Sequence, residues 1–233
     1  MEQILRKLEK GLIVSCQALP HEPLYGSDIM AKMAIAAEEG GAVGIRANTP
    51  WDIKEIKKHV SLPVIGLYKK RYADSDIYIT PTIDDVREIV KAGADIVAFD
   101  ATYRKRPDDQ PLDAFVRQIR QEYPGLPLMA DISTFEEAVV ADELEVDVIS
   151  TTLAGYTEDT KHLRGFDEVL LSEILRACQK PVIAEGRVHS PDIAKKCLEQ
   201  GAYAVVVGAA ITRPQEITKR FVSEMMAVSY KET

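Results

Sequence analysis

Two residues of this chain combine the types and positions that proton transfer at a carbon atom requires. Lys69 ends the apolar segment Pro63–Lys69, and Glu185 ends the apolar segment Pro181–Glu185. An amine and a carboxylate in one cleft can each remove or return a proton when their pKa values lie near the working pH. Burial or the nearby Arg46 must lower the pKa of Lys69 from about 10.4 before its amine acts as a base or a nucleophile. Lys69 and Glu185 are the candidate catalytic pair.

Polar residues also end other apolar segments of the chain. They are Gln17, Arg46, Asp100, Asp131 and the neighbouring pair Thr151 and Thr152. A polar group in such a position costs desolvation free energy unless it is paired or binds a ligand. We therefore expect these side chains to gather around a ligand, although Glu185 could instead only hold the rim together by pairing with Arg187 or Lys69.

Small residues and arginines near the last two apolar segments predict an anion site. Gly186 and Arg187 directly follow Glu185, while Gly208 and Ala209 come shortly before a helix that starts near Pro214. Small residues leave backbone N–H groups accessible, and such loops bind phosphate in barrel enzymes. The predicted phosphate-binding residues are Gly186, Arg187, Gly208 and Ala209, with Arg187 or Arg213 balancing the charge. The alternative is that Gly208 and the alanines only ease packing.

These residues can meet only if the segments that carry them are strands of one sheet. Eight short segments have the composition of strands buried on both faces. They are Leu12–Gln17, Ala42–Ala47, Pro63–Lys69, Asp95–Ala101, Pro127–Ile132, Asp147–Thr152, Pro181–Glu185 and Ala204–Gly208. Helical patterns fill the gaps, so the eight units predict a (β/α)8 TIM barrel that spans residues 1–233 as a single domain. Strands three and seven lie four apart in such a ring, so Lys69 and Glu185 should face each other across its mouth.

Helix signals support this alternation. Thr49 and Ser190 each precede a proline, which is typical of a helix start, and Thr134 with Glu137 has capping-box spacing. A short amphipathic helix is expected at the N-terminus. An open, doubly wound sheet is the alternative fold, but its glycine-rich first turn is missing from Ser15–Ala18.

Composition argues against several classes of function. The formal net charge of −8 disfavours a nucleic-acid partner, and no apolar run approaches the roughly 18 residues of a membrane span. The three cysteines lack metal-binding spacing and indicate reduced thiols in a cytoplasmic protein. The four histidines also lack such spacing, so we expect neither a metal nor another cofactor.

The chain resembles the N-acetylmannosamine-6-phosphate 2-epimerases of bacterial sialic-acid breakdown over nearly its entire length. Each matching stretch is weak evidence alone, but all of them occur in order. The stretches are Ser15–Ala18, Gly44–Ala47, Val64–Lys69, Ile79–Thr82, Gly93–Ile96, Ala130–Thr134, Thr151–Thr157, Ile183–Arg187 and Gly208–Arg213. Ala154 and Ala209 depart from the family, in which serine is common at both positions.

The resemblance implies conversion of N-acetylmannosamine 6-phosphate into N-acetylglucosamine 6-phosphate, a phosphorylated N-acetyl amino sugar in each case. It also implies that Lys69 and Glu185 are the acid/base residues. The residues that it places around the sugar are Gln17, Arg46, Asp131 and Arg213.

Other functions remain open from the residues. A Schiff-base aldolase would use Lys69 as a nucleophile on a carbonyl, and borohydride would then trap the sugar on its amine. A non-enzymic phosphosugar-binding barrel would bind the ligand without exchange at C2, and an isomerase of tryptophan or histidine synthesis is a further alternative. Met225 and Met226 near the C-terminus suggest a contact in a homodimer.

Overall fold

Eight parallel strands close into a barrel in the computed structural model, which describes residues 2–228. The predicted (β/α)8 fold is therefore confirmed: seven of the predicted strands contain an observed one, and the eighth, Ala42–Ala47, overlaps β2 but ends one residue before it. The strands are β1 (Leu12–Cys16), β2 (Gly44–Asn48), β3 (Val64–Leu67), β4 (Ile96–Asp100), β5 (Leu128–Asp131), β6 (Val148–Ser150), β7 (Val182–Ala184) and β8 (Ala204–Val207). The prediction that Arg46 ends its strand is wrong, because β2 continues for two more residues.

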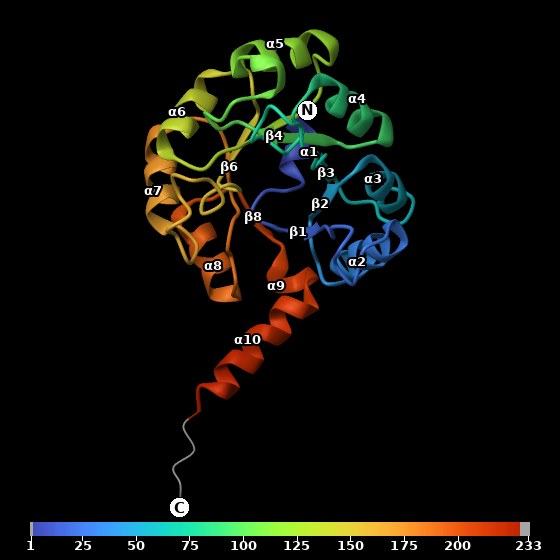
Figure 1. Cartoon of the computed structure of the whole chain (residues 1–233), viewed down its shortest axis with the longest axis vertical. Coiled ribbons are helices and arrows are strands. Elements are labelled where there is room, and N and C mark those ends of the chain that lie inside the picture. The colour runs from blue at the N-terminus through green and yellow to red at the C-terminus, as the bar shows by residue number, and fades with distance from the viewer. Residues whose placement is uncertain (1, 229–233) are drawn as a thin grey trace, which may run out of the picture.

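Helices surround the barrel in the order in which the chain alternates (Figure 1). They are α1 (Glu2–Arg6), α2 (Ser27–Glu39), α3 (Pro50–Ile56), α4 (Ile83–Ala92), α5 (Leu112–Glu122), α6 (Phe135–Glu143), α7 (Glu168–Ala177), α8 (Pro191–Gln200), α9 (Ala209–Thr212) and α10 (Pro214–Met226). The predicted caps are present, since Thr49 and Ser190 each accept a backbone hydrogen bond and Thr134 forms a capping box with Glu137. None of the helices in residues 2–228 has both the length and the apolar character needed to cross a membrane.

The barrel interior is apolar near the N-terminal ends of the strands and polar near their C-terminal ends. Alternate residues of each strand face inward, and on β3 and β7 these begin with Ile65 and Ile183, which belong to the apolar cluster inside the barrel. The same alternation brings Lys69 and Glu185 inward just beyond the strands. The predicted N-terminal helix is present as α1, and Leu8, which follows it, is fully buried in this cluster.

One segment interrupts the pairing of β3 with β4. The two strands pair only at Ile65 with Ile96 and Gly66 with Val97. Beyond this point Ile79 lies between them, because it bridges antiparallel to Lys69 and its carbonyl accepts a hydrogen bond from Asp100 N at 3.0 Å. The loop after β3 is thus part of the barrel wall, and it fixes the backbone of Lys69.

Candidate active site

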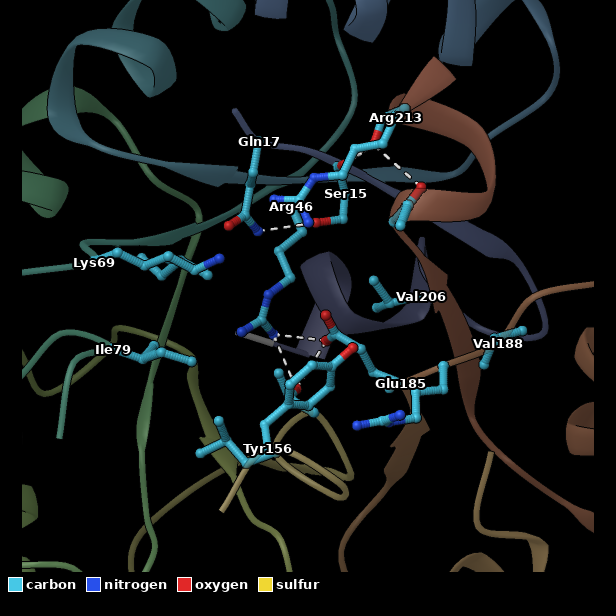
Figure 2. A pocket seen from close by; sticks show the side chains of 18 of the residues that line it. Ser15, Gln17, Arg46, Lys69, Ile79, Tyr156, Glu185, Val188, Val206 and Arg213 are labelled. Carbon is cyan, nitrogen blue, oxygen red and sulfur yellow. Dashed lines mark hydrogen bonds and ion pairs between the residues drawn. The ribbon is translucent and has the colours of Figure 1, made fainter. Parts of the chain in front are cut away.

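A cavity opens at the C-terminal ends of the strands, where barrel enzymes carry their active sites. It comprises about 840 Å³ of atom-free space, part of which is open to solvent. Most of the predicted site residues line it, namely Gln17, Arg46, Lys69, Glu185, Gly186, Arg187, Gly208, Ala209 and Arg213. Figure 2 shows Lys69 and Glu185 entering from opposite sides, with Arg46 between them.

Arg46 joins two carboxyl groups inside the barrel. Its side chain is 0% exposed, and Nη1 and Nη2 bond to the two oxygens of Asp131 at 3.1 and 2.5 Å. Its Nη1 also lies 2.9 Å from Glu185 Oε2. Burial alone would lower the pKa of Arg46, but the two carboxylates raise it above its ordinary value. Arg46 therefore stays charged and holds the position of both acids.

Glu185 is held through both its backbone and its side chain by two consecutive threonines. Thr151 Oγ1 accepts a hydrogen bond from Glu185 N at 2.9 Å and donates one to Glu185 O at 2.8 Å. Thr152 Oγ1 lies 2.8 Å from Glu185 Oε2. Burial raises the pKa of Glu185 above its ordinary range; Arg46 opposes this shift, and Asp131 adds to it. Glu185 can therefore carry a proton at a pH where an exposed glutamate would not.

Lys69 has the opposite shift. Burial, together with the nearby charges of Arg46 and Arg213, lowers the pKa of Lys69 to about 8, while Glu185 and Glu22 oppose the shift. Asn48 accepts a hydrogen bond from Lys69 N at 2.8 Å, which fixes the backbone from which the amine projects. The amine of Lys69 makes no hydrogen bond or ion pair with any described residue. It is thus available to a ligand, and at a given pH a larger fraction of it is neutral than of an exposed lysine amine.

The rim of the cavity holds two further arginines and an amide. Arg213 pairs with Glu22 at 2.9 Å, and Arg187 donates a hydrogen bond to the carbonyl of Gly155 at 2.6 Å. Gln17 Nε2 donates to the Ser15 hydroxyl at 2.9 Å, whereas its buried Oε1 has no partner among residues 2–228. An acceptor in this state favours a ligand that carries a donor.

The loop after β7 needs glycine for its approach to the cavity. Gly186 has a φ of 91°, and an added Cβ would lie 3.1 Å from the carbonyl oxygen of Thr151. The next residue, Arg187, also has a positive φ, of 61°. The close approach of the Thr151 carbonyl therefore requires glycine at position 186, and both residues, which belong to the predicted anion site, line the cavity.

The chain was compared with known proteins. The family profile described as "Putative N-acetylmannosamine-6-phosphate epimerase" matches residues 30–227. The chain belongs to this family. It is 57% identical over 220 residues to the "Putative N-acetylmannosamine-6-phosphate 2-epimerase" of Caldanaerobacter subterraneus subsp. tengcongensis, covering 94% of this chain and 93% of that protein. The protein of the same name from Listeria monocytogenes serotype 4b is 51% identical over 227 residues, covering 97% and 98%.

A solved structure of a relative agrees with this assignment. It is described as the N-acetylmannosamine-6-phosphate 2-epimerase from Clostridium perfringens and superposes with a TM-score of 0.91 at 49% identity. The match covers 94% of this chain and 95% of that one. The family resemblance seen in the sequence is therefore confirmed over nearly the whole chain.

Two aspartates that look alike in the sequence of this family member lie in different surroundings. Asp131 is fully buried, pairs with Arg46 and does not line the cavity, unlike the other predicted site residues. Asp100 pairs instead with Arg104 at 2.5 Å and accepts hydrogen bonds from Thr102, away from the cavity. Among the described residues, no group of three or more histidines, cysteines and acids could hold a metal ion.

Several residues that the sequence did not single out for this site also line it. They are Ser15, Tyr78, Tyr156, His189 and Thr212, together with apolar residues of the strands. Thr152, noted only as a strand end, contacts both Asp131 and Glu185. The alternation of β1 could have indicated Ser15, which lies two residues before Gln17. The tyrosines come from loops and carry no such signal.

Replacing Arg46 by methionine should strongly destabilise the fold. Removing one partner of a buried ion pair leaves uncompensated charge and typically costs about 3–5 kcal/mol. Arg87 is a matched control, because it also pairs with two acids, Asp84 and Glu122, but at the surface. Arg87→Met should lose at most about 1 kcal/mol. Urea unfolding of both variants measures the difference, and equal losses would contradict the role assigned to Arg46.

Proposed function

We propose that this protein interconverts N-acetylmannosamine 6-phosphate and N-acetylglucosamine 6-phosphate by moving a proton at C2. The observation that carries the proposal is the pair of Lys69 and Glu185, which enter one cavity from opposite sides (Figure 2) with pKa values shifted toward each other. Membership of the epimerase family supports the same reaction. The chain is on this basis a cofactor-independent isomerase of amino sugar breakdown.

The chemistry at C2 needs an open-chain sugar. The closed ring has no carbonyl beside C2, so the ring must first open to the aldehyde. Removal of the C2 proton then gives a carbanion that spreads onto the carbonyl oxygen at C1 as an enolate, with the acetamido nitrogen on C2. Return of a proton on the other face inverts the centre, and two groups on opposite sides of C2 meet this need most simply. The charge of Arg46 would stabilise the developing oxyanion.

The pair can work in both directions with the same number of protons. Lys69 neutral with Glu185 protonated has the same total charge as Lys69 protonated with Glu185 ionised. Each state provides one base and one acid. The reverse reaction starts from the state that the forward reaction leaves, so neither direction requires a change in the charge of the buried site. A route in which one residue acts twice with help from the acetamido group is the alternative, and exchange experiments on single variants separate the two.

The remaining predicted residues hold the substrate in this proposal. Gly186, Arg187, Gly208 and Ala209 bind the phosphate, and Arg213 contributes charge at the same end. Gln17 and Arg46 contact the open-chain sugar. Asp131 acts indirectly, through Arg46, because its carboxylate pairs with Arg46 and does not line the cavity. Support comes from the lining of the cavity and from the backbone conformation at Gly186.

Lys69→Ala and Glu185→Ala should fold normally and lose catalysis by at least roughly a hundredfold, the lower range for a general acid or base. NMR of N-acetylmannosamine 6-phosphate in deuterium oxide measures both epimer conversion and deuterium at C2 of the product. Near-full activity in either variant would refute its role. Borohydride trapping of a sugar on Lys69 would instead support the aldolase.

The rate should depend on pH as a bell-shaped curve. The active pair holds one proton in either direction, and this proton is lost above the pKa of Lys69, about 8. A second proton binds as the pH falls through the raised pKa of Glu185. We therefore expect kcat/KM to fall on the acid and the alkaline side of its maximum, with the alkaline limb near pH 8. A rate that keeps rising well above this pH would show that Lys69 acts only as a base.

We also propose a homodimer in which α10 packs against a partner. None of the residues of α10 is buried, and Figure 1 shows the helix extending away from the barrel. Phe221, Val222, Met225 and Met226 lie on one face of it and are highly exposed. An exposed apolar surface of this kind is typical of a protein contact, and it includes the two methionines singled out in the sequence.

A charge on this face should separate the subunits. We expect Phe221→Glu with Met225→Glu to elute as a monomer in size-exclusion chromatography with light scattering, because the dimer would bury both charges. Val169→Glu on α7 is the control, since Val169 is as exposed as Phe221, at 67% and 68%. Wild-type protein that is already a monomer would exclude the dimer.

A further inference from the structure

The hydroxyl of Thr152 lies between the two buried acids. Its Oγ1 is 2.8 Å from Asp131 Oδ1 and 2.8 Å from Glu185 Oε2, and the Ser150 hydroxyl is 2.9 Å away. A hydroxyl has a single hydrogen to donate. Thr152 can therefore donate to one of these acids at a time.

The second acid needs a hydrogen of its own. Ionised carboxylates only accept hydrogen bonds. If both acids were ionised, one of the two short contacts would bring lone pairs of Thr152 and a carboxylate together inside a buried site. A proton on one carboxyl group removes this repulsion, because that group then donates to Thr152 while Thr152 donates to the other.

The contacts of Arg46 decide which acid carries the proton. Asp131 accepts hydrogen bonds on both oxygens from the guanidinium, which favours its ionised form. Arg46 Nη1 is also 2.9 Å from Glu185 Oε2. However, its hydrogen bonds are directed to Asp131, to Met129 Sδ at 3.7 Å and to Thr152 at 3.5 Å. Asp131 thus accepts two hydrogen bonds from the guanidinium, whereas Glu185 has only the ion-pair contact, so Glu185 is the better place for the proton.

We propose that Thr152 is a positioning residue that holds Glu185 in its protonated, acidic form. In this arrangement Glu185 donates to Thr152, and Thr152 donates to the ionised Asp131. Asp131 then contributes to catalysis through Thr152 as well as through Arg46. The inference rests on the proposed epimerase function. It names protonated Glu185 as the acid and neutral Lys69 as the base within one protonation state of the site.

The proton transfers balance in this scheme. The C2–H bond breaks and its proton goes to the Lys69 amine, while the electron pair moves onto the carbonyl oxygen to form the enolate. Glu185 then gives its proton to the opposite face of C2, and the carbonyl forms again. The enzyme is left with ammonium at Lys69 and carboxylate at Glu185, and exchange with water restores the first state. Thr152 turns its hydrogen toward whichever carboxylate accepts it.

Two variants of Thr152 test the proposal. Thr152→Val keeps the shape but removes the hydroxyl, whereas Thr152→Ser keeps the hydroxyl and is the matched control. We expect Thr152→Val to lower kcat by roughly tenfold to a hundredfold, the rate equivalent of one hydrogen bond to a charged group, with KM changed by less than about threefold. Thr152→Ser should retain most of the wild-type kcat.

The pH dependence separates this role from a merely structural one. Protonated Glu185 loses its acceptor in Thr152→Val, so the acid limb of kcat should move down by about one pH unit, as expected for one hydrogen bond. In Thr152→Ser the limb should stay at the wild-type position. An acid limb of Thr152→Val that stays in place or moves up would overturn the proposal.

A measurement on the wild-type protein is independent of activity and of the folding of variants. Carbon-13 NMR of protein labelled at glutamate carboxyl groups, with Glu185→Gln to assign the signal, reports the protonation of Glu185 directly. We expect this group to remain protonated at a pH where the exposed glutamates are ionised. An ionised Glu185 would refute the role of Thr152, whereas absence of deuterium exchange at C2 in wild type would refute the epimerase function itself.

Discussion

A guanidinium group that is completely withdrawn from solvent lies between two carboxyl groups near the top of the barrel. Such a charge is stable inside a protein only when its partners are held in position and their remaining hydrogen bonds are satisfied. Asp131, Glu185 and the hydroxyl of Thr152 hold the terminal nitrogens of Arg46, whereas its buried Nε has no hydrogen-bond partner among the described residues. The three acidic and basic groups, which come from β2, β5 and the end of β7, therefore fix one another across the barrel.

This buried cluster also sets the electrostatics of the cavity above it. Burial is the largest cause of both pKa shifts. The positive charge of Arg46 lowers the pKa of Lys69 further, whereas at Glu185 Arg46 opposes the rise in pKa and the negative charge of Asp131 adds to it. Burial has these opposite effects on the two pKa values because it disfavours the charged form of each group. An amine and a carboxyl group whose pKa values approach each other can exchange roles as acid and base with little change in free energy. A reaction that runs in both directions needs such a pair.

Much of this arrangement was accessible from the sequence because strands have a regular period. Lys69 and Glu185 lie two residues beyond Leu67 and Ile183, which face the barrel interior, so their direction followed from alternation alone. The different surroundings of Asp131 and Asp100 did not follow from alternation. Both occupy paired positions on adjacent strands.

The difference between these two aspartates depends on partners from elsewhere in the chain. Asp131 meets Arg46 across the barrel, while Asp100 meets Arg104 from the following loop. Asp100 and Arg104 are only four residues apart, but the contact of Asp131 with Arg46 joins residues 85 positions apart and leaves no local signal. For the same reason the sequence overlooked Tyr78 and Tyr156, which irregular loops bring to the cavity.

The insertion of Ile79 between β3 and β4 has a consequence for how the cavity admits its ligand. Because this segment is bonded to both neighbours, it cannot swing outward without breaking the sheet and displacing Lys69. The half of the entrance nearest the amine is therefore rigid. Tyr156 lines another part of the cavity, where its exposed ring contacts the side chain of Arg187. The Ile79 side of the entrance therefore keeps the reacting amine in place while a sugar enters.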